Sequence, residues 1–188
     1  TMKQTWKPGT LIYPLPAVLV SCGNCPDNYN MLTVAWTGTI CTDPAMCYIS
    51  VRPSRHSYSL IKESMEFTIN LTTEKMAKAT DWAGVRSGTE YNKWQQTGLT
   101  PVKGQKVSSP YIDESPVNIE CRVRQIISLG SHDMFIAEVV NVLADESLID
   151  PETGAFNMQK AGLIAYSHGA YYSLGEQIGR FGWSVKKK

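Results

Sequence analysis

The chain has 188 residues, enough for one domain that buries a sizeable core without disulfides or metals. Its 43% hydrophobic and 19% charged residues are typical of globular proteins, and a net charge of +1 provides no basic field for nucleic acid. No apolar run reaches the roughly 18 residues of a membrane span, and the first residues lack the apolar core of a signal peptide. We therefore expect a cytoplasmic protein with no nucleic-acid or membrane partner, whose basic tail, residues 186–188, is solvated.

The first part of the chain alternates apolar runs with turn residues. Residues 15–22, bounded by prolines and a glycine, predict a strand, and residues 23–28 predict a turn. Residues 31–37 predict a second strand in a hairpin with the first. Residues 38–43 either continue this second strand or form a turn after it. Residues 45–51 form a nearly continuous apolar run, typical of a strand buried on both faces.

The hydrophobic period then changes from strand to helix and back. Apolar residues at helical spacing predict a helix over residues 53–65, with Ser54 or Ser57 as its N-cap. In residues 67–71 apolar and polar side chains alternate, which predicts a half-buried strand.

Two short helices and a long ribbon follow. Helical patterns cover residues 74–82 and 90–97, with residues 84–88 as the loop between them. Residues 117–127 alternate most clearly, and after a Gly-Ser-His-Asp turn residues 134–143 predict the returning strand. The pair predicts a long antiparallel ribbon.

The whole pattern defines a fold class. Residues 150–154 predict a turn, and the aromatic, glycine-rich residues 161–184 match no element clearly. About six or seven strands, mostly linked by hairpins, with two or three short helices predict a mainly β protein of α+β type. We expect a closed or split β-barrel, antiparallel and of Greek-key type. The absence of a G-x-G-x-x-G fingerprint and of βαβ alternation excludes the usual nicotinamide domain.

Polar side chains gather where the strand of residues 45–51 meets the next helix. Helix N-termini present free N–H groups and a partial positive charge, which suit an anion. Arg52 and Arg55 add formal charge that matches phosphate oxygens, and Ser54 and Ser57 add hydroxyl donors. These residues predict a monophosphate pocket; the alternative is a capped surface helix with two solvated arginines.

Two other segments could contact the same ligand. Ser87 and Gly88 lie in a loop whose glycines let the backbone approach a ligand, and Lys93 follows one to two turns into the next helix. The alternative there is a flexible interhelical loop. Ala35 would let a flat ligand lie near the backbone and Trp36 could stack on it, although an ordinary core strand with a buried tryptophan has the same pattern.

The cysteines and histidines suggest no separate centre. The five cysteines are an odd number, which argues against a disulfide framework, and Cys22 and Cys25 form a C-x-x-C motif at a hairpin end. No further ligands complete a zinc site, so we expect a turn with two incidental thiols and no metal. His132 is interpreted as a polar turn residue, and His168 lies among aromatic residues where a structural role is favoured.

Taken in order, these segments resemble the flavin reductase-like family of FMN-binding split barrels, and above all its flavoredoxin branch. The matching segments are residues 14–21, 30–38, 43–44, 48–57, 67–71, 84–88, 93, 98–99, 115–121, 130–133, 137–139 and 174–175. None is specific alone, but their order is, and together they extend over nearly the whole chain.

The resemblance implies a homodimer with FMN between the subunits. A single domain, residues 1–188, would have a barrel core over about residues 10–145 and an extension, about residues 146–188, at the dimer interface. By motif match, the isoalloxazine would lie against Asn30, Thr33, Val34, Ala35, Trp36 and Thr37. The ribityl chain and phosphate would lie against Ser50, Arg52, Ser54 and Ser57, under Ser87, Gly88 and Lys93.

FMN would supply the redox chemistry, so the resemblance implies no catalytic side chain. It implies an oxidoreductase that passes electrons from NAD(P)H through FMN to a small-molecule or protein acceptor, as flavin and ferric reductases and flavoredoxins do. Three alternatives stay open: a non-catalytic FMN electron carrier, a flavin-free thiol or metal protein centred on Cys22 and Cys25, and a barrel for another flat ligand such as haem or a deazaflavin.

Overall fold

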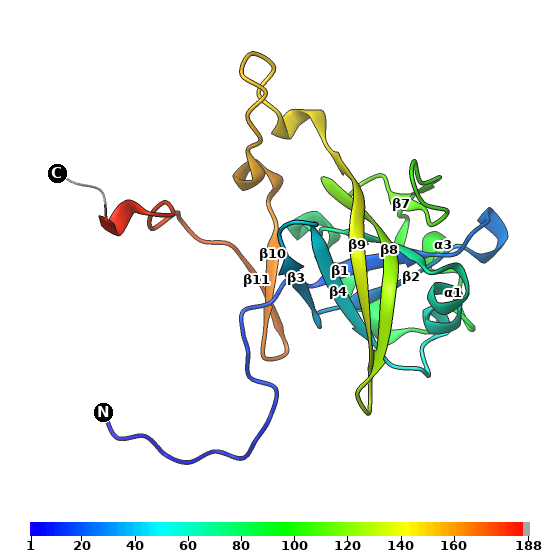
Figure 1. Ribbon diagram of the computed structural model, residues 1–188, viewed down its shortest axis with the longest axis horizontal. Coiled ribbons are helices and arrows are strands. Elements are labelled where there is room, and N and C mark those ends of the chain that lie inside the picture. The colour runs from blue at the N-terminus through cyan, green and yellow to red at the C-terminus, as the bar shows by residue number, and fades with distance from the viewer. Residues whose placement is uncertain (186–188) are drawn as a thin grey trace.

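A computed structural model describes residues 1–185; the basic tail of residues 186–188 lies outside the described part. Seven strands form one antiparallel sheet in the order β2-β1-β5-β8-β9-β4-β3 (Figure 1). They are β1 (Val18–Cys22), β2 (Asn30–Val34), β3 (Thr37–Cys41), β4 (Met46–Val51), β5 (Glu66–Asn70), β8 (Val117–Ser128) and β9 (Asp133–Ala144). Two small hairpin sheets pair β6 (Pro101–Val102) with β7 (Tyr111–Ile112), and β10 (Ile164–Ser167) with β11 (Ala170–Ser173).

The order of the strands forces the sheet to curl. Its two edge strands, β2 and β3, are consecutive in the chain and are joined only by Ala35 and Trp36. In a flat sheet these edges would lie six strand spacings apart, roughly 28 Å, whereas the linking residues span about 10 Å. The sheet therefore closes into a barrel. Among residues 1–185, β2 pairs with no strand but β1, so the barrel is split along this seam.

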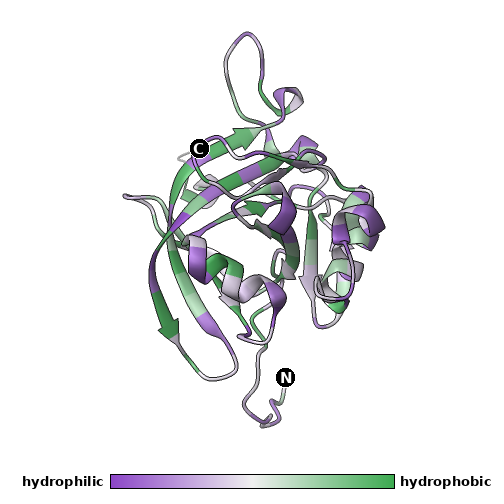
Figure 2. Cartoon of the chain, turned by 90° about the vertical axis from the view of Figure 1, so that its right-hand side faces the viewer, coloured by the Kyte–Doolittle hydropathy of each residue, from purple (hydrophilic) through white to green (hydrophobic). Residues whose placement is uncertain are grey.

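Two hydrophobic cores hold the barrel and its helices together. The interior core consists of Val18, Val20, Cys22, Leu32, Val34, Cys47, Ile49, Val51, Ile61, Phe67, Ile69, Cys121, Val123, Phe135 and Ala137. The outer core, between β1–β2 and the helices α2 (Ala77–Val85) and α3 (Lys93–Thr97), consists of Leu19, Met31, Met76, Ala83, Leu99 and Ile112. Because β1 contributes to both cores, all of its residues are buried. Hydrophobic residues accordingly concentrate along the strands, and the helices around them are more hydrophilic (Figure 2).

The prediction that residues 67–71 form a half-buried strand was wrong. Strand β5 is buried along both faces, and Asn70 is fully buried. The Asn70 amide donates to the Leu19 carbonyl at 2.9 Å, and its side-chain oxygen accepts from the Ile112 N–H at 2.9 Å and from Asn118 at 2.8 Å. A polar side chain whose hydrogen bonds are all made can be buried at little cost. The alternation of apolar and polar residues therefore wrongly predicted that the polar face of this strand is exposed.

The helix over residues 53–65 exists, but its predicted N-caps were wrong. Helix α1 is His56–Ser64, and its N-cap is Arg55, in an extended conformation with no side-chain capping bond. Ser57 instead lies in the first turn, where its hydroxyl accepts a hydrogen bond from Asn30 at 2.7 Å. The Ser57 hydroxyl therefore faces β2 rather than the free N–H groups of its own helix.

The two short helices are displaced from their predicted bounds. Helix α2 extends to Val85, so the loop predicted for residues 84–88 begins at residue 86, two residues later than predicted. Helix α3 begins at Lys93 because the Asn92 side chain caps it, which shortens the predicted helix of residues 90–97. Short 3-10 helices complete the secondary structure: Pro26–Asn28, Glu74–Met76, Glu146–Leu148, Met158–Ala161 and Trp183–Val185.

The unassigned residues 161–184 contain the hairpin β10–β11. It is tied to the barrel through Leu15, whose N–H donates to the Tyr166 carbonyl at 2.9 Å. The N-terminal residues and the residues after β11 extend away from the barrel on the same side as this hairpin (Figure 1). Within residues 1–185, none of the helices has the length and apolar character needed to cross a membrane.

Candidate functional site

Three adjoining hollows form one groove along the seam of the barrel. The aromatic hollow has a volume of about 300 Å³ and is bounded by Trp36, Tyr166 and Tyr171. The middle hollow, of about 180 Å³, lies beside Arg52. The cationic hollow, of about 230 Å³, lies beside Lys93. The aromatic and middle hollows share Thr33, Val34, Ser50, Gly84 and His132. The middle and cationic hollows share Leu32 and Arg55. The shared walls make a continuous channel for an elongated ligand.

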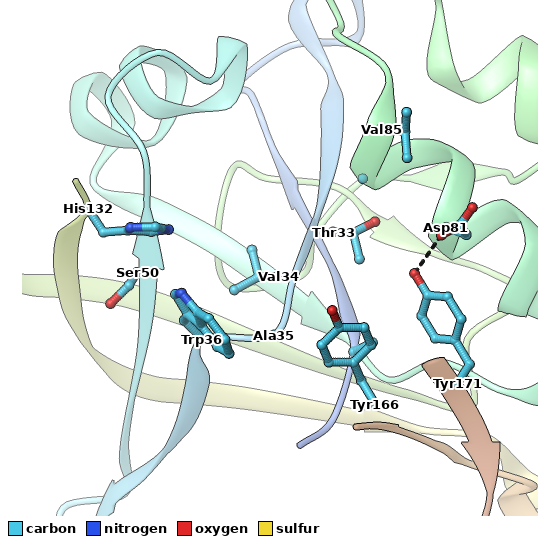
Figure 3. A pocket seen from close by; sticks show the side chains of 12 residues that line it. Thr33, Val34, Ala35, Trp36, Ser50, Asp81, Val85, His132, Tyr166 and Tyr171 are labelled. Carbon is cyan, nitrogen blue, oxygen red and sulfur yellow. Dashed lines mark hydrogen bonds between the residues drawn. The ribbon is translucent and has the colours of Figure 1, made fainter. Parts of the chain in front are cut away.

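The aromatic hollow lies between the seam and the β10–β11 hairpin. Trp36 borders one side, and Tyr166 and Tyr171 border the opposite side (Figure 3). The Tyr171 hydroxyl donates a hydrogen bond of 2.9 Å to the Asp81 carboxylate on α2. Burial and the Asp81 carboxylate raise the pKa of Tyr171 to about 12, so the phenol stays protonated and this bond ties β11 to α2.

The seam also presents unpaired backbone donors to the aromatic hollow. The carbonyls of Ala35 and Trp36 accept from the N–H groups of Thr37 at 3.0 Å and Ser50 at 2.9 Å. In the described residues, no backbone or side-chain acceptor takes the N–H groups of Ala35 and Trp36 themselves. Both residues are half-buried and line the aromatic hollow, so their N–H groups are free to donate to a ligand with acceptor atoms in its plane.

The middle hollow is bordered by His132 at the tip of the β8–β9 hairpin. Burial and the nearby Arg52 guanidinium lower the pKa of His132, so the imidazole is neutral at pH 7. One ring nitrogen lies 2.7 Å from the Ser131 hydroxyl. The turn is fixed by Asp133 at the start of β9, whose carboxylate accepts from the Tyr58 hydroxyl. His132, interpreted from the sequence as a polar turn residue, thus lines the groove.

The cationic hollow has the composition of an anion site. Three cationic side chains line it, those of Arg55, Arg86 and Lys93, and among residues 1–185 no Asp or Glu does. The hydroxyls available there belong to Ser54, Ser57 and Ser87. Positive charge with hydroxyl donors and no carboxylate suits a phosphate group.

Two of these cations are held by the C-terminal end of α2. The Lys93 ammonium donates to the Ala83 carbonyl at 2.7 Å, and the Arg55 guanidinium donates to the Gly84 carbonyl at 3.2 Å. The negative end of a helix dipole stabilises such cations. Nevertheless, burial and the neighbouring Arg55 lower the pKa of Lys93 from 10.5 to about 8. An anion in the hollow would stabilise the charged form of Lys93 against both effects.

A close approach of backbone to side chain fixes the shape of the cationic hollow. A Cβ atom on Gly88 would lie 2.5 Å from the Asn30 side-chain oxygen, closer than atoms can approach. The loop therefore lies directly against Asn30, which in turn donates to Ser57 at 2.7 Å. Only glycine allows this packing.

The groove brings together all but one of the residues expected from the resemblance to contact flavin. Thr37 does not line it: its side chain is buried and donates to the Tyr48 carbonyl on β4 at 2.7 Å. Asn30, expected beside the isoalloxazine, lies at the cationic end instead. The predicted position of Lys93 was also wrong, since it is the first residue of α3 rather than one to two turns inside it.

Sequence reasoning missed several residues of the groove. Asp81 reaches the aromatic hollow from α2 and Tyr166 reaches it from β10, and no local pattern connects either element to the seam. Arg55 was noted for its charge but not included among the expected ligands, although it lines two hollows. Its place directly before α1, in the same segment as Arg52, was the available signal.

The thiol and metal alternative receives no support from the geometry. Cys22 is buried beside the cationic hollow, and burial raises its pKa to about 12, so it is not a reactive thiolate. Cys25 is exposed, and the structure shows no disulfide between the two. Within the described residues, no group of three or more His, Cys, Asp or Glu side chains could hold a metal ion.

Comparison with known proteins agrees with this geometry. Residues 10–175 match the model of the flavin reductase like domain. The flavoredoxin of Desulfovibrio vulgaris (Miyazaki F) is 31% identical, with a TM-score of 0.90 over 98% of this chain and 100% of that one. An FMN-binding protein from Thermus thermophilus is 23% identical, with a TM-score of 0.80 over 95% and 99% of the two chains. An uncharacterised protein of Archaeoglobus fulgidus is 32% identical over 139 residues, 74% of this chain and 77% of that one.

The fold is thus the flavin-binding split barrel, a fold of flavin-related oxidoreductases. The chain belongs to the flavin reductase-like family. The resemblance found in the sequence and the predicted antiparallel split barrel with a few short helices are confirmed. The homodimer and the individual ligand contacts stay predictions.

The bond between Tyr171 and Asp81 can be tested through the hairpin that it holds. We expect Tyr171→Phe to accelerate amide hydrogen exchange of residues 164–173 about fivefold, because a net hydrogen bond contributes about 1 kcal/mol. Tyr172→Phe is the matched control, since in residues 1–185 the Tyr172 hydroxyl has no hydrogen-bond partner and its side chain is 56% exposed. Equal exchange rates in the two variants would show that the bond does not hold the hairpin.

Proposed function

We propose that the chain binds FMN along the groove and functions as an NAD(P)H-dependent flavin oxidoreductase. The isoalloxazine would lie in the aromatic hollow, the ribityl chain in the middle hollow and the phosphate in the cationic hollow. One observation supports this arrangement above others: a single groove joins a phosphate-type hollow free of carboxylates to an aromatic hollow with unpaired backbone donors. FMN has an anion, a flexible polyol and a flat ring in that same order.

The cationic end would hold the phosphate by charge and hydrogen bonds. Arg55 and Lys93 already point their donors at the end of α2, and an anion beside them would be stabilised by both charges. The hydroxyls of Ser54, Ser57 and Ser87 would complete the contacts. Arg52 is exposed beside the middle hollow, so it would neutralise the phosphate from the ribityl side together with Ser50.

At the aromatic end, the protein would orient the ring and adjust its electronic properties. The free N–H groups of Ala35 and Trp36 would donate to acceptor atoms of the ring, and the Trp36 indole offers an apolar surface beside it. Bound FMN would supply the hydride and electron transfer itself. Neutral His132 could donate or accept a single hydrogen bond at the border of the ring and ribityl positions.

An enzyme requires access for NAD(P)H and for a small-molecule or protein acceptor, whereas a pure electron carrier does not. The aromatic hollow, about 300 Å³, is at the small end of ligand pockets. A ring that filled it would border the β10–β11 hairpin at Tyr166 and Tyr171. Because that hairpin is not part of the seven-stranded sheet, it would open on release of the Tyr171–Asp81 bond and of its bonds to Leu15, with the barrel left intact, which favours the enzyme.

We also propose that the chain is a homodimer whose extension, residues 146–188, and N-terminal arm contribute to the interface. Large apolar side chains are exposed on both arms: Trp6 at 71%, Ile178 at 95% and Phe181 at 109%. Exposed apolar residues on arms that leave the body together are typical of an interface with a second chain. The arms leave beside the β10–β11 hairpin, so the partner would lie near the aromatic hollow (Figure 1).

The cofactor proposal predicts a large contribution from the phosphate. We expect FMN to bind the apoprotein about 100-fold more tightly than riboflavin, because two charge-assisted hydrogen bonds contribute roughly 3 kcal/mol together. Fluorescence titration with both ligands measures this ratio. Equal affinities, or no yellow chromophore under excess FMN, would contradict the site.

Stopped-flow mixing of the FMN-loaded protein with NADH and with NADPH separates the enzyme from the electron carrier. The flavin absorbance of the enzyme bleaches rapidly, and that of the electron carrier does not.

The depressed pKa of Lys93 predicts a pH dependence of FMN binding. The phosphate is a dianion above about pH 7, so its own charge stays constant from there to pH 9.5. Because Lys93 loses its proton above pH 8, FMN affinity should fall about tenfold over that range. Lys93→Met should bind weakly with no such fall, and Lys78→Met, an exposed charge loss on α2, should behave as wild type. A pH-independent wild-type affinity would refute this role of Lys93.

The dimer proposal predicts the mass in solution. Multi-angle light scattering should give twice the chain mass of 20.9 kDa, and deletion of residues 1–12 should weaken the association because it removes the exposed Trp6. A stable species of 20.9 kDa at micromolar concentration would exclude the homodimer.

A further inference from the structure

Charge is distributed unevenly along the groove. The cationic hollow is lined by three cations, whereas in residues 1–185 the only Asp, Glu, Lys or Arg side chain that lines the aromatic hollow is that of Asp81. His132 also lines the aromatic hollow, but burial and a nearby guanidinium lower its pKa and leave the imidazole neutral at pH 7. The end of the groove proposed for the flavin ring thus has a negative charge, opposite to the end proposed for the phosphate.

The charge of Asp81 is not neutralised inside the protein. The residue lies on α2, and its side chain faces the β10–β11 hairpin, on the opposite side of the hollow from Trp36 (Figure 3). One carboxylate oxygen accepts from the Tyr171 hydroxyl at 2.9 Å, and no group of the described residues donates to the other oxygen. Over the same residues, no cation lies within ion-pair distance of the carboxylate. A reactant in the hollow would therefore meet an unpaired negative charge.

Tyr171 shows how this border of the hollow treats an anion. Burial raises the pKa of the Tyr171 phenol most, and Asp81 raises it further through its hydrogen bond and its charge, to about 12. The phenolate, an anion beside the hollow, is therefore disfavoured over the neutral phenol. Another anion brought to this border would meet the same burial and the same carboxylate.

The reactants of the proposed function differ in how they suit this field. The nicotinamide ring of NAD(P)H is uncharged before it passes a hydride to the flavin and cationic afterwards, so a carboxylate beside it would stabilise the charge that develops. An uncharged or cationic acceptor meets no repulsion from Asp81. An anionic acceptor, such as a ferric ion chelated by an excess of carboxylates, would be repelled.

We propose that Asp81 is a specificity-determining residue of the aromatic hollow, where it favours uncharged and cationic reactants and disfavours anionic ones. The inference rests on the proposed function, because it requires the ring to lie in this hollow with the reactant between the ring and the β10–β11 hairpin. It narrows the small-molecule acceptors to uncharged organic molecules and cationic metal complexes.

The test uses three probes of nearly the same shape: benzoate, benzamide and benzamidine, which at about pH 7 are an anion, an uncharged molecule and a cation. Each is titrated into the FMN-loaded protein at low ionic strength. The change in the flavin absorption spectrum gives its dissociation constant without turnover. Asp81→Asn removes the charge and keeps an oxygen that can accept from Tyr171. Asp113→Asn is the matched control, since Asp113 is exposed and lines none of the three hollows.

In the wild type and in Asp113→Asn we expect benzoate to bind about tenfold more weakly than benzamidine, with benzamide between them. In Asp81→Asn we expect this ratio to fall about fivefold, with benzamide unchanged within about threefold. The difference between wild type and Asp81→Asn should disappear in about 1 M salt, where the screening length is about 3 Å.

Four results would each overturn the role of Asp81: a wild type that binds benzoate as tightly as benzamidine, a ratio unchanged in Asp81→Asn, an equal loss for all three probes, or no binding of any probe to protein that holds FMN. The proposed function is tested separately by the first step of the experiment. If the chain does not retain FMN, the proposed function fails and this inference fails with it, whereas tight FMN binding with an unchanged ratio removes the role of Asp81 alone.

Discussion

The site depends on one topological constraint: the two edge strands of a seven-stranded sheet are joined by Ala35 and Trp36 alone. The short link forces the sheet to close, but β2 and β3 leave the link in different directions, so no ladder forms between them. Closure without pairing leaves a seam, and a seam leaves backbone N–H groups without partners. The groove follows this seam because the end of β2 and the link supply its floor from Leu32 to Trp36. The part of the barrel whose backbone N–H groups lack partners within the protein is thus the part able to bind a polar, planar ligand.

At the other end of the groove, the constraint is electrostatic. Lys93 is only 3% exposed, and its burial and a second cation, Arg55, lower the pKa of Lys93. The carbonyls of Ala83 and Gly84 compensate in part, since they are the negative end of α2. Two like charges held together in a half-buried corner remain unfavourable without an anion. A bound phosphate would offset part of the repulsion between these two cations. This gives a physical basis for selecting phosphorylated over unphosphorylated ligands.

Sequence patterns predicted what local interactions determine. The hairpin β8–β9 and the strands β1, β2 and β4 follow from alternation and turn residues, and the segment from Ser50 to Ser57 was found because a strand end, a helix start and two arginines are adjacent in the chain. The predictions that failed concern contacts between residues far apart in the sequence. The burial of Asn70 depends on partners 42 to 51 residues away, Asn30 lies at the cationic end because Ser57 holds it there, and Asp81 meets Tyr171 across 90 residues. Patterns of period 2 or 3.6 contain no information on such contacts, whereas the order of weak motifs along the chain identified the family.

Helix α2 connects the two ends of the groove, which no single segment of the sequence would indicate. Its last turn supplies the carbonyls of Ala83 and Gly84 to the cations, and one turn earlier Asp81 holds the hairpin over the aromatic hollow. On the inner side, Thr33 of β2 donates to the Thr80 carbonyl at 2.5 Å, which fixes the helix to the floor of the groove. Residues 80 to 84 span little more than one helical turn and move as one unit. Their position therefore sets the distance between the phosphate corner and the ring hollow, so a ligand that fits one end constrains the other.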